Sequence, residues 1–234
     1  MGIKKYTALL LCAVTVCAAA SAGITYKEKE ASVTVPAEER QVIILDAGHG
    51  GFDGGAVAND GTVEKDINLA IATVLADFLR TGGYEVIMTR DSDVSTDDGD
   101  SSKISSRKKS DMRNRLELIK KYPDSVFVSI HLNKFTTSAA SGSQVFYGPK
   151  CEESKPLGEY IQSSIIKLLQ PQNKRVNKQA TSSTYLLYNA PVPAVLVECG
   201  FLSNTAELER LKDESYQKKM AFCIFCGIED YFSE

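Results

Sequence analysis

The sequence lacks several features that would direct it to other classes of protein. Its 27 lysines and arginines do not outnumber its 30 aspartates and glutamates, and the formal net charge is −3. A general nucleic-acid binder usually has a basic excess, so that class is disfavoured. No internal repeat divides the 234 residues, and the 43% hydrophobic content is enough for one well-buried domain. The composition therefore favours a single, mildly acidic globular domain that binds no nucleic acid.

Cysteine patterns typical of disulfide scaffolds or metal sites are also missing. Two of the six cysteines lie within residues 1–22. Cys223 and Cys226 are three positions apart in a helical apolar pattern, so they share a face and are predicted to pack in the core. A zinc or redox C-x-x-C site would need a second pair or a strand–turn–helix setting. Cys199 is predicted to be a small buried side chain. The absence of a G-x-S-x-G motif disfavours a serine hydrolase.

Residues 1–22 are typical of an export signal. Lys4 and Lys5 form a basic start, residues 8–20 are apolar and small, and the segment ends on the sequence Ala-Ser-Ala, which fits an A-x-A cleavage site. The uncharged stretch 6–26 is also about 20 residues long, which is enough to span a bilayer as an uncleaved anchor. Both interpretations place the rest of the chain outside the cytoplasmic membrane, with N-terminal membrane association under the second.

Apolar runs alternate with helical patterns along the remaining sequence. Residues 23–40 are polar and charged and are predicted to form a tether, and the folded domain is expected over 41–232. Strands alternating with helices predict a three-layer α/β domain around a largely parallel sheet. The predicted strands are 42–45, 84–88, 125–130, 143–147, 184–188 and 194–198. The predicted helices begin near Asp66, before Met112, near 155, after Asn204 and near Ser215.

Histidine is scarce, and the positions of the two that occur are informative. His49 and His131 each follow directly on an apolar run, and a third run ends on Glu198. Glu64 lies near the start of the first long helical pattern. Open α/β sheets bind ligands outside the carboxyl ends of their strands, so these side chains are expected to lie together.

Two imidazoles and one carboxylate form a known ligand set of catalytic zinc sites, in which one position stays open for water or substrate. Zinc in such a site lowers the pKa of water to about 7. A second carboxylate must then move the proton from this water to the leaving group, and Glu198 is the candidate for that general acid–base role. His49, Glu64 and His131 are the candidate ligands.

Each of these residues also has an ordinary structural explanation. A histidine after a strand is often a hydrogen-bonded loop residue, and Glu64 could stabilise a helix N-terminus by about 0.3–1 kcal/mol. Glu198 could be an ion-pair partner, and Asp46 either forms a turn or orients a ligand. The joint placement on successive strand ends favours the metal site over these separate explanations.

Four segments in order resemble one enzyme family. LDAGHGGFDGGA, VEKD, SIHLN and VECGF are similar to motifs of the zinc-dependent N-acetylmuramoyl-L-alanine amidases of the amidase 3 type, over residues 41–232. The resemblance implies that His49, Glu64 and His131 bind one zinc ion and that Glu198 is catalytic. It also implies cleavage of the amide between the lactyl group of muramic acid and L-alanine in peptidoglycan. The implied fold is a single α/β domain with a mixed sheet of about six strands and helices on both faces.

The segments VIMTRDSD and RKKSDMRNRLELI further resemble sporulation amidases of that family. This resemblance implies removal of peptides from cortex muramic acid before muramic-δ-lactam forms. A general autolysin of cell separation or lysis is the alternative, and an accessory envelope protein could supply targeting. A non-catalytic peptidoglycan-binding module would be expected to have lost Glu198 or a ligand. The sequence leaves open the substrate length, the oligomeric state and the metal itself, since such a site accepts other divalent ions.

Overall fold

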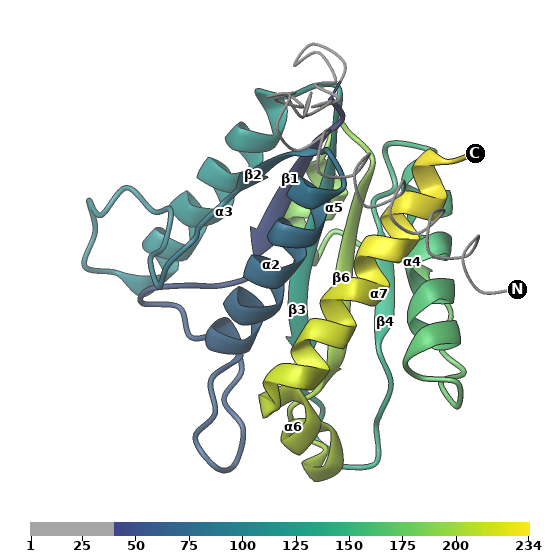
Figure 1. The fold of residues 1–234 in the computed structure, drawn as a ribbon. Coiled ribbons are helices and arrows are strands. Elements are labelled where there is room, and N and C mark those ends of the chain that lie inside the picture. The colour runs from purple at the N-terminus through teal and green to yellow at the C-terminus, as the bar shows by residue number, and fades with distance from the viewer. Residues whose placement is uncertain (1–39) are drawn as a thin grey trace, which may run out of the picture. The chain divides into compact units, whose positions relative to one another are not determined.

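A six-stranded mixed sheet with helices on both faces forms the framework of the protein (Figure 1). The structure is a computed structural model and describes residues 40–234. The strand order is β2-β1-β3-β6-β4-β5; the first four strands run parallel, and β4 lies antiparallel to β6. The predicted fold, a mixed and mostly parallel sheet of about six strands, is therefore confirmed.

The bounds of the elements follow the sequence patterns closely in most places. The strands are β1 (Val42–Ala47), β2 (Glu85–Met88), β3 (Ser125–Asn133), β4 (Gln144–Tyr147), β5 (Lys178–Gln179) and β6 (Ala194–Phe201). The helices are α2 (Glu64–Thr81), α3 (Ile104–Lys120), α4 (Ser154–Leu168), α5 (Tyr185–Asn189), α6 (Thr205–Lys212) and α7 (Glu214–Phe232). The side chain of Asn204 accepts a hydrogen bond from the Glu207 amide, so it caps α6 as predicted.

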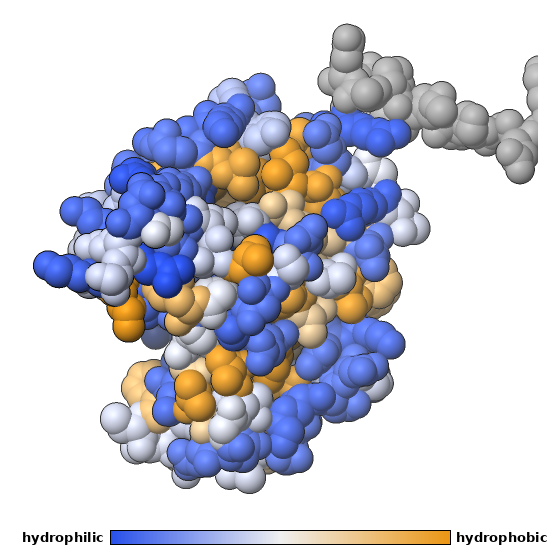
Figure 2. All heavy atoms as spheres, turned by 90° about the vertical axis from the view of Figure 1, so that its left-hand side faces the viewer, coloured by the Kyte–Doolittle hydropathy of each residue, from blue (hydrophilic) through white to orange (hydrophobic). Residues whose placement is uncertain are grey.

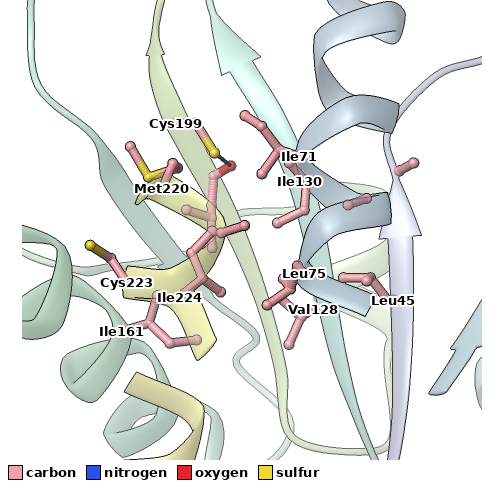
Figure 3. Close-up of a cluster of buried hydrophobic side chains, with 14 of the residues drawn as sticks. Leu45, Ile71, Leu75, Val128, Ile130, Ile161, Cys199, Met220, Cys223 and Ile224 are labelled. Atoms are coloured by element: carbon pink, nitrogen blue, oxygen red, sulfur yellow. Dashed lines mark hydrogen bonds between the residues drawn. The ribbon is translucent and has the colours of Figure 1, made fainter. Parts of the chain in front are cut away.

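One face of the sheet is covered by α2, α4 and α7 and holds an apolar core (Figures 1 and 3). Leu45, Val128 and Ile130 point from the strands towards the helices, where Leu75 and Ile224 meet them. All five side chains are fully buried. Burying one such side chain stabilises the fold by about 1.5–3 kcal/mol. This face is therefore the main source of stability.

The predicted packing of the cysteines is correct in part. Cys199 and Cys223 are buried in the apolar core (Figure 3), whereas Cys226 is partly exposed. The four cysteines within residues 40–234 are free thiols. No disulfide therefore supports the described part of the fold.

The opposite face, covered by α3 and α5, changes character along the strands. Ile44, Phe127 and Leu196 form a second apolar cluster near the strand beginnings. Alternate residues of a strand point to the same side, so the residues two and four positions further along each strand lie on this face as well. Towards the carboxyl ends these residues are polar. Register places Asp46 beside Ser129 and His131 beside Glu198. The polar end of this face holds the predicted site residues.

The segment 184–188 was predicted as a strand, and this prediction is wrong. It forms the short helix α5, in which Leu186 and Leu187 are buried while Tyr185 and Tyr188 are exposed. Two exposed residues three positions apart fit a helix, but a run of five residues is too short for periodicity to separate helix from strand. The predicted loop 171–183 also contains the two-residue strand β5.

The predicted export signal or anchor, residues 1–22, lies outside the described residues, as does nearly all of the predicted tether, 23–40. Within residues 40–234, no helix is both long enough and apolar enough to cross a membrane.

Candidate metal centre

His49, Glu64 and His131 come together from three separate elements. His49 lies in the loop after β1, Glu64 is the first residue of α2, and His131 belongs to β3. Each offers a ligand atom within 4.8 Å of the others. His131 Nδ1 lies 3.0 Å from one oxygen of Glu64, and His49 Nε2 lies 3.4 Å from the other. The structure thus assembles the three predicted ligands into one cluster.

The glycine-rich loop after β1 allows His49 to approach the cluster. His49 has φ +64°, the only positive φ of a non-glycine residue within the part of the chain that the structure describes. The left-handed conformation costs an L-residue roughly 1–2 kcal/mol. Gly48 is needed for a different reason, because a Cβ there would meet the His131 ring at 2.3 Å. The loop therefore stores strain and leaves no room for a side chain beside the second imidazole.

The carboxylate of Glu64 is buried and held by several donors. The backbone amides of Ala56 and Leu132 donate to it at 2.8 and 3.0 Å, and Asn68 Nδ2 donates at 3.3 Å. Burial by itself would raise the pKa of Glu64, but hydrogen bonds and charge interactions with His131 and His49 hold it well below its usual range. The side chain is therefore a charged carboxylate in a fixed orientation.

His49 is oriented by a carboxylate on its other nitrogen. Its Nδ1 lies 2.9 Å from Asp53, whose second oxygen pairs with Lys108 at 2.8 Å. Burial opposes protonation of His49, but the hydrogen bonds to Asp53 and Glu64 raise its pKa to about 9. These carboxylates favour positive charge at this position, and a bound cation would be favoured for the same reason. A carboxylate behind a ligating histidine is also the usual way to fix its orientation.

Glu198 lies beside this cluster and has an unpaired carboxylate oxygen. Strand register pairs it with His131, so both side chains point to the α3 side of the sheet. Its Oε2 is buried and has no hydrogen-bond partner among residues 40–234. Burial raises the pKa of Glu198 to about 7, with His131 and His49 opposing the shift and Glu64 adding to it. Glu198 can therefore hold or release a proton near neutral pH.

Two adjoining cavities open next to these residues. The larger has a volume of about 350 Å³ and is lined by His49 and His131 together with side chains of α3 and α5. The smaller has about 230 Å³ and reaches Glu198. Ser183, Thr184 and Leu196 line both cavities. The left-hand side of the molecule in Figure 1, where α3 is drawn, has a mostly hydrophilic surface with apolar side chains in separate patches (Figure 2). A ligand thus has space beside both the cluster and Glu198.

A family model described as N-acetylmuramoyl-L-alanine amidase matches residues 43–230. The chain belongs to this family.

Known relatives of this amidase agree in sequence and in structure. The germination-specific N-acetylmuramoyl-L-alanine amidase of Bacillus subtilis is 38% identical over 194 residues, which cover 83% of this chain and 81% of the relative. The CwlD amidase of Clostridioides difficile, solved in complex with the GerS lipoprotein, is 41% identical with a TM-score of 0.80, covering 83% of this chain and 99% of that one. An N-acetylmuramoyl-L-alanine amidase of Clostridium difficile 630 is 28% identical with a TM-score of 0.73, covering 83% and 98%.

Several residues that support the cluster were not identified from the sequence. Asp53 and Asn68 each lie four positions after a candidate ligand, a spacing that could have indicated them. Arg90 and Arg115 lie inside the two segments that resemble sporulation amidases, but nothing in the sequence indicates what they contact. Asp46 was considered as a partner of a ligand; it instead contacts Arg115, Ser129 and Thr89.

Proposed function

We propose that His49, Glu64 and His131 bind one zinc ion, and that Glu198 is the catalytic acid–base residue of an N-acetylmuramoyl-L-alanine amidase. The cluster consists of two imidazoles and one carboxylate and has a cavity beside it, which fits a catalytic zinc site. The unpaired, buried oxygen of Glu198 beside that cluster is the observation that carries the proposal. A carboxylate kept without a partner in such a place costs stability, and a catalytic role explains why it is there.

The reaction is hydrolysis of the amide that joins the lactyl group of N-acetylmuramic acid to L-alanine. Zinc, when bound, supplies Lewis acidity towards the attacked carbonyl and lowers the pKa of water. Glu198 accepts the proton of the attacking water as the new C–O bond forms. It then donates this proton to the nitrogen of L-alanine as the C–N bond breaks. Burial of Glu198 raises its pKa, which favours the protonated form that donates in the second transfer. The products are a lactyl carboxylate and a peptide with a free amino terminus.

Product analysis tests the reaction directly. The full chain is incubated with purified peptidoglycan, and the products are separated and identified by mass spectrometry. We expect peptides that begin with L-alanine, together with glycan strands that keep their lactyl groups. A chelator is expected to stop the release and added zinc to restore it. Release of reducing sugar ends without free peptides, or release that a chelator does not affect, would contradict the proposal.

For the biological role we propose maturation of the spore cortex, where loss of the peptide precedes muramic-δ-lactam formation. The germination-specific relative and the CwlD structure support this role. The GerS lipoprotein in that structure supports an accessory envelope lipoprotein as a partner here. Mass spectrometry of cortex fragments from a deletion strain decides between this role and a general autolysin. Intact muramic-δ-lactam in that strain would exclude the cortex role.

We also propose that the catalytic domain, residues 41–232, acts outside the cytoplasmic membrane. Residues 1–22 serve as a signal or anchor and 23–40 as a tether, which the basic start and apolar run of the sequence support. N-terminal sequencing of the protein from the cell envelope distinguishes the two forms. A terminus near residue 23 shows cleavage, and an intact terminus in the membrane fraction shows an anchor. Recovery from the cytoplasm alone would contradict export.

A further inference from the structure

Two buried arginines lie beneath the loop that carries His49. Arg90 follows β2 and is 3% exposed, and Arg115 of α3 is 1% exposed. Arg115 is paired with two carboxylates, Asp46 and Asp111. Arg90 has no carboxylate partner among residues 40–234 and donates instead to backbone carbonyls. Burying a guanidinium without an ion pair costs free energy, and the hydrogen bonds to backbone carbonyls offset only part of this cost. The position of Arg90 therefore requires an explanation.

The contacts of Arg90 join the two segments that carry candidate ligands. Its Nη2 donates to the carbonyl of Gly48 at 3.1 Å and to that of Lys65 at 2.7 Å. Gly48 directly precedes His49, and Lys65 directly follows Glu64. A single nitrogen atom thus connects the loop after β1 to the first turn of α2.

Further donors restrain the strained residue itself. Arg90 Nε donates to the Ala47 carbonyl at 2.8 Å, and Arg115 Nη2 donates to the His49 carbonyl at 2.8 Å. Three consecutive carbonyls, those of Ala47, Gly48 and His49, therefore accept hydrogen bonds from the two guanidinium groups. A non-glycine residue keeps a positive φ only where several surrounding contacts hold its backbone in that conformation. Here the arginines provide that restraint on the backbone of His49.

We propose that Arg90 is a positioning residue of the metal centre, which holds the His49 loop and the first turn of α2 at the separation that a bound cation requires. This inference rests on the proposed zinc site. Arg90 touches neither ligand side chain and acts through the backbone on each side. Loss of a group that hydrogen-bonds a ligand side chain typically weakens metal affinity by about 10- to 100-fold, and we expect an effect of that order from Arg90, which restrains the two segments that carry His49 and Glu64.

Arg90 can be replaced without leaving its main acceptors unpaired. The Ala47 carbonyl also accepts from Arg115 at 3.2 Å, and the Gly48 carbonyl also accepts from Asn68 at 3.1 Å. Arg90→Met keeps most of the buried stem and removes all the donors. Arg90→Lys keeps the charge but cannot reach several carbonyls from one planar group. The two variants therefore separate charge from geometry.

The test measures the zinc dissociation constant of the full chain by competition with a chromophoric chelator. We expect affinity to fall in the order wild type, Arg90→Lys, Arg90→Met, with a loss of about 10-fold or more in the last. The absorption spectrum of the cobalt-substituted protein reports ligand geometry independently of turnover and is expected to change in Arg90→Met. At saturating zinc, kcat should fall while KM changes little, because substrate contacts are untouched.

Ile165→Ala is the matched control, because Ile165 is fully buried in α4 within the apolar core. It should lower the melting temperature without changing zinc affinity or the cobalt spectrum. Zinc affinity within twofold of wild type in a folded Arg90→Met would overturn the inference. If Arg90→Met does not fold, the same criterion is applied to Arg90→Lys. Failure of the wild type to bind zinc would instead contradict the proposed function.

Discussion

The two faces of the sheet use neighbouring residues of the same strands for different purposes. On β1, Leu45 points into the apolar core, and Asp46 points into the polar network on the other side. On β6, Cys199 faces the core, and Glu198 points to the side that holds the candidate metal centre. On the face covered by α2, α4 and α7 the strands present apolar side chains along their length, whereas on the α3 face their side chains become polar and charged at the strand ends.

The difference shows how one sheet can be both stable and reactive. Buried charges and unpaired carboxylates cost free energy, and the α3 face holds Asp46, Arg115 and Glu198. The apolar face offsets this cost by burying large aliphatic side chains. Substitutions at adjacent positions should therefore separate stability from activity.

The largest expected effect is on turnover, from Glu198→Gln. An amide cannot carry the proton between water and the leaving amine, so kcat should fall by roughly 10²- to 10⁴-fold. Zinc content should remain that of the wild type, and the melting temperature should not fall, because the shape is kept and an unpaired buried charge is removed. Peptide release from peptidoglycan measures the first quantity, and elemental analysis with thermal unfolding measures the others.

The neighbouring variant Cys199→Ala is the control for this pair. It should keep wild-type turnover while losing some stability, because its side chain lies in the apolar core. Comparable turnover in Glu198→Gln and Cys199→Ala would show that the two faces do not divide the tasks in this way.

A smaller effect, on stability, is expected from Asp46→Ala. The change leaves the fully buried guanidinium of Arg115 with one carboxylate fewer. Breaking a buried pair by removing one partner costs about 3–5 kcal/mol. Urea denaturation measures the free energy of unfolding. A loss below about 1 kcal/mol, the level of an exposed ion pair, would show that the pair contributes no more than a surface one.

Leu45→Ala should also destabilise, by about 2–5 kcal/mol, through loss of buried apolar surface and the cavity it leaves. Its folded fraction, in contrast to Glu198→Gln, is expected to keep the kcat and zinc affinity of the wild type. Activity is measured at a temperature where the variant is fully folded. A specific loss of kcat under these conditions would show that packing on the apolar face controls the site.

The smallest expected effect is a pH dependence that belongs to the polar face alone. Burial by itself would raise the pKa of Asp46, but Arg115 and the hydrogen bonds from Ser129 and Thr89 hold it at about 2. A lowered folded-state pKa contributes stability that is present above the ordinary value of about 4 and is lost as the pH falls towards 2. Its size is about 2 kcal/mol.

Unfolding free energies of the metal-free chain between pH 5 and pH 2 measure this contribution. The slope of the unfolding free energy against pH should be smaller in Asp46→Asn than in the wild type, whereas Leu45→Ala should keep the wild-type slope. Equal slopes in all three proteins would assign the acid sensitivity to other carboxylates.

Most of the fold follows from local sequence patterns. Long amphipathic runs such as 215–231 and apolar runs such as 125–130 predict elements that the structure contains, because periodicity of 3.6 or 2 reflects which face is buried. The five-residue run 184–188 was assigned wrongly, since a strand and one helical turn present similar patterns at that length. The direction of β4 also depends on its partner strand and has no local signal.

The sequence by itself determined which side chains are the candidates for the chemistry. His49, Glu64, His131 and Glu198 could be selected because each is placed by its own strand end or helix start, and the motifs around them resemble the family. Tertiary structure alone decided how these groups are held. Arg90 and Gly48 are 42 positions apart, and Arg115 and Asp46 are 69 apart. Contacts of that range arise only when the sheet assembles, so no pattern within one segment predicts them.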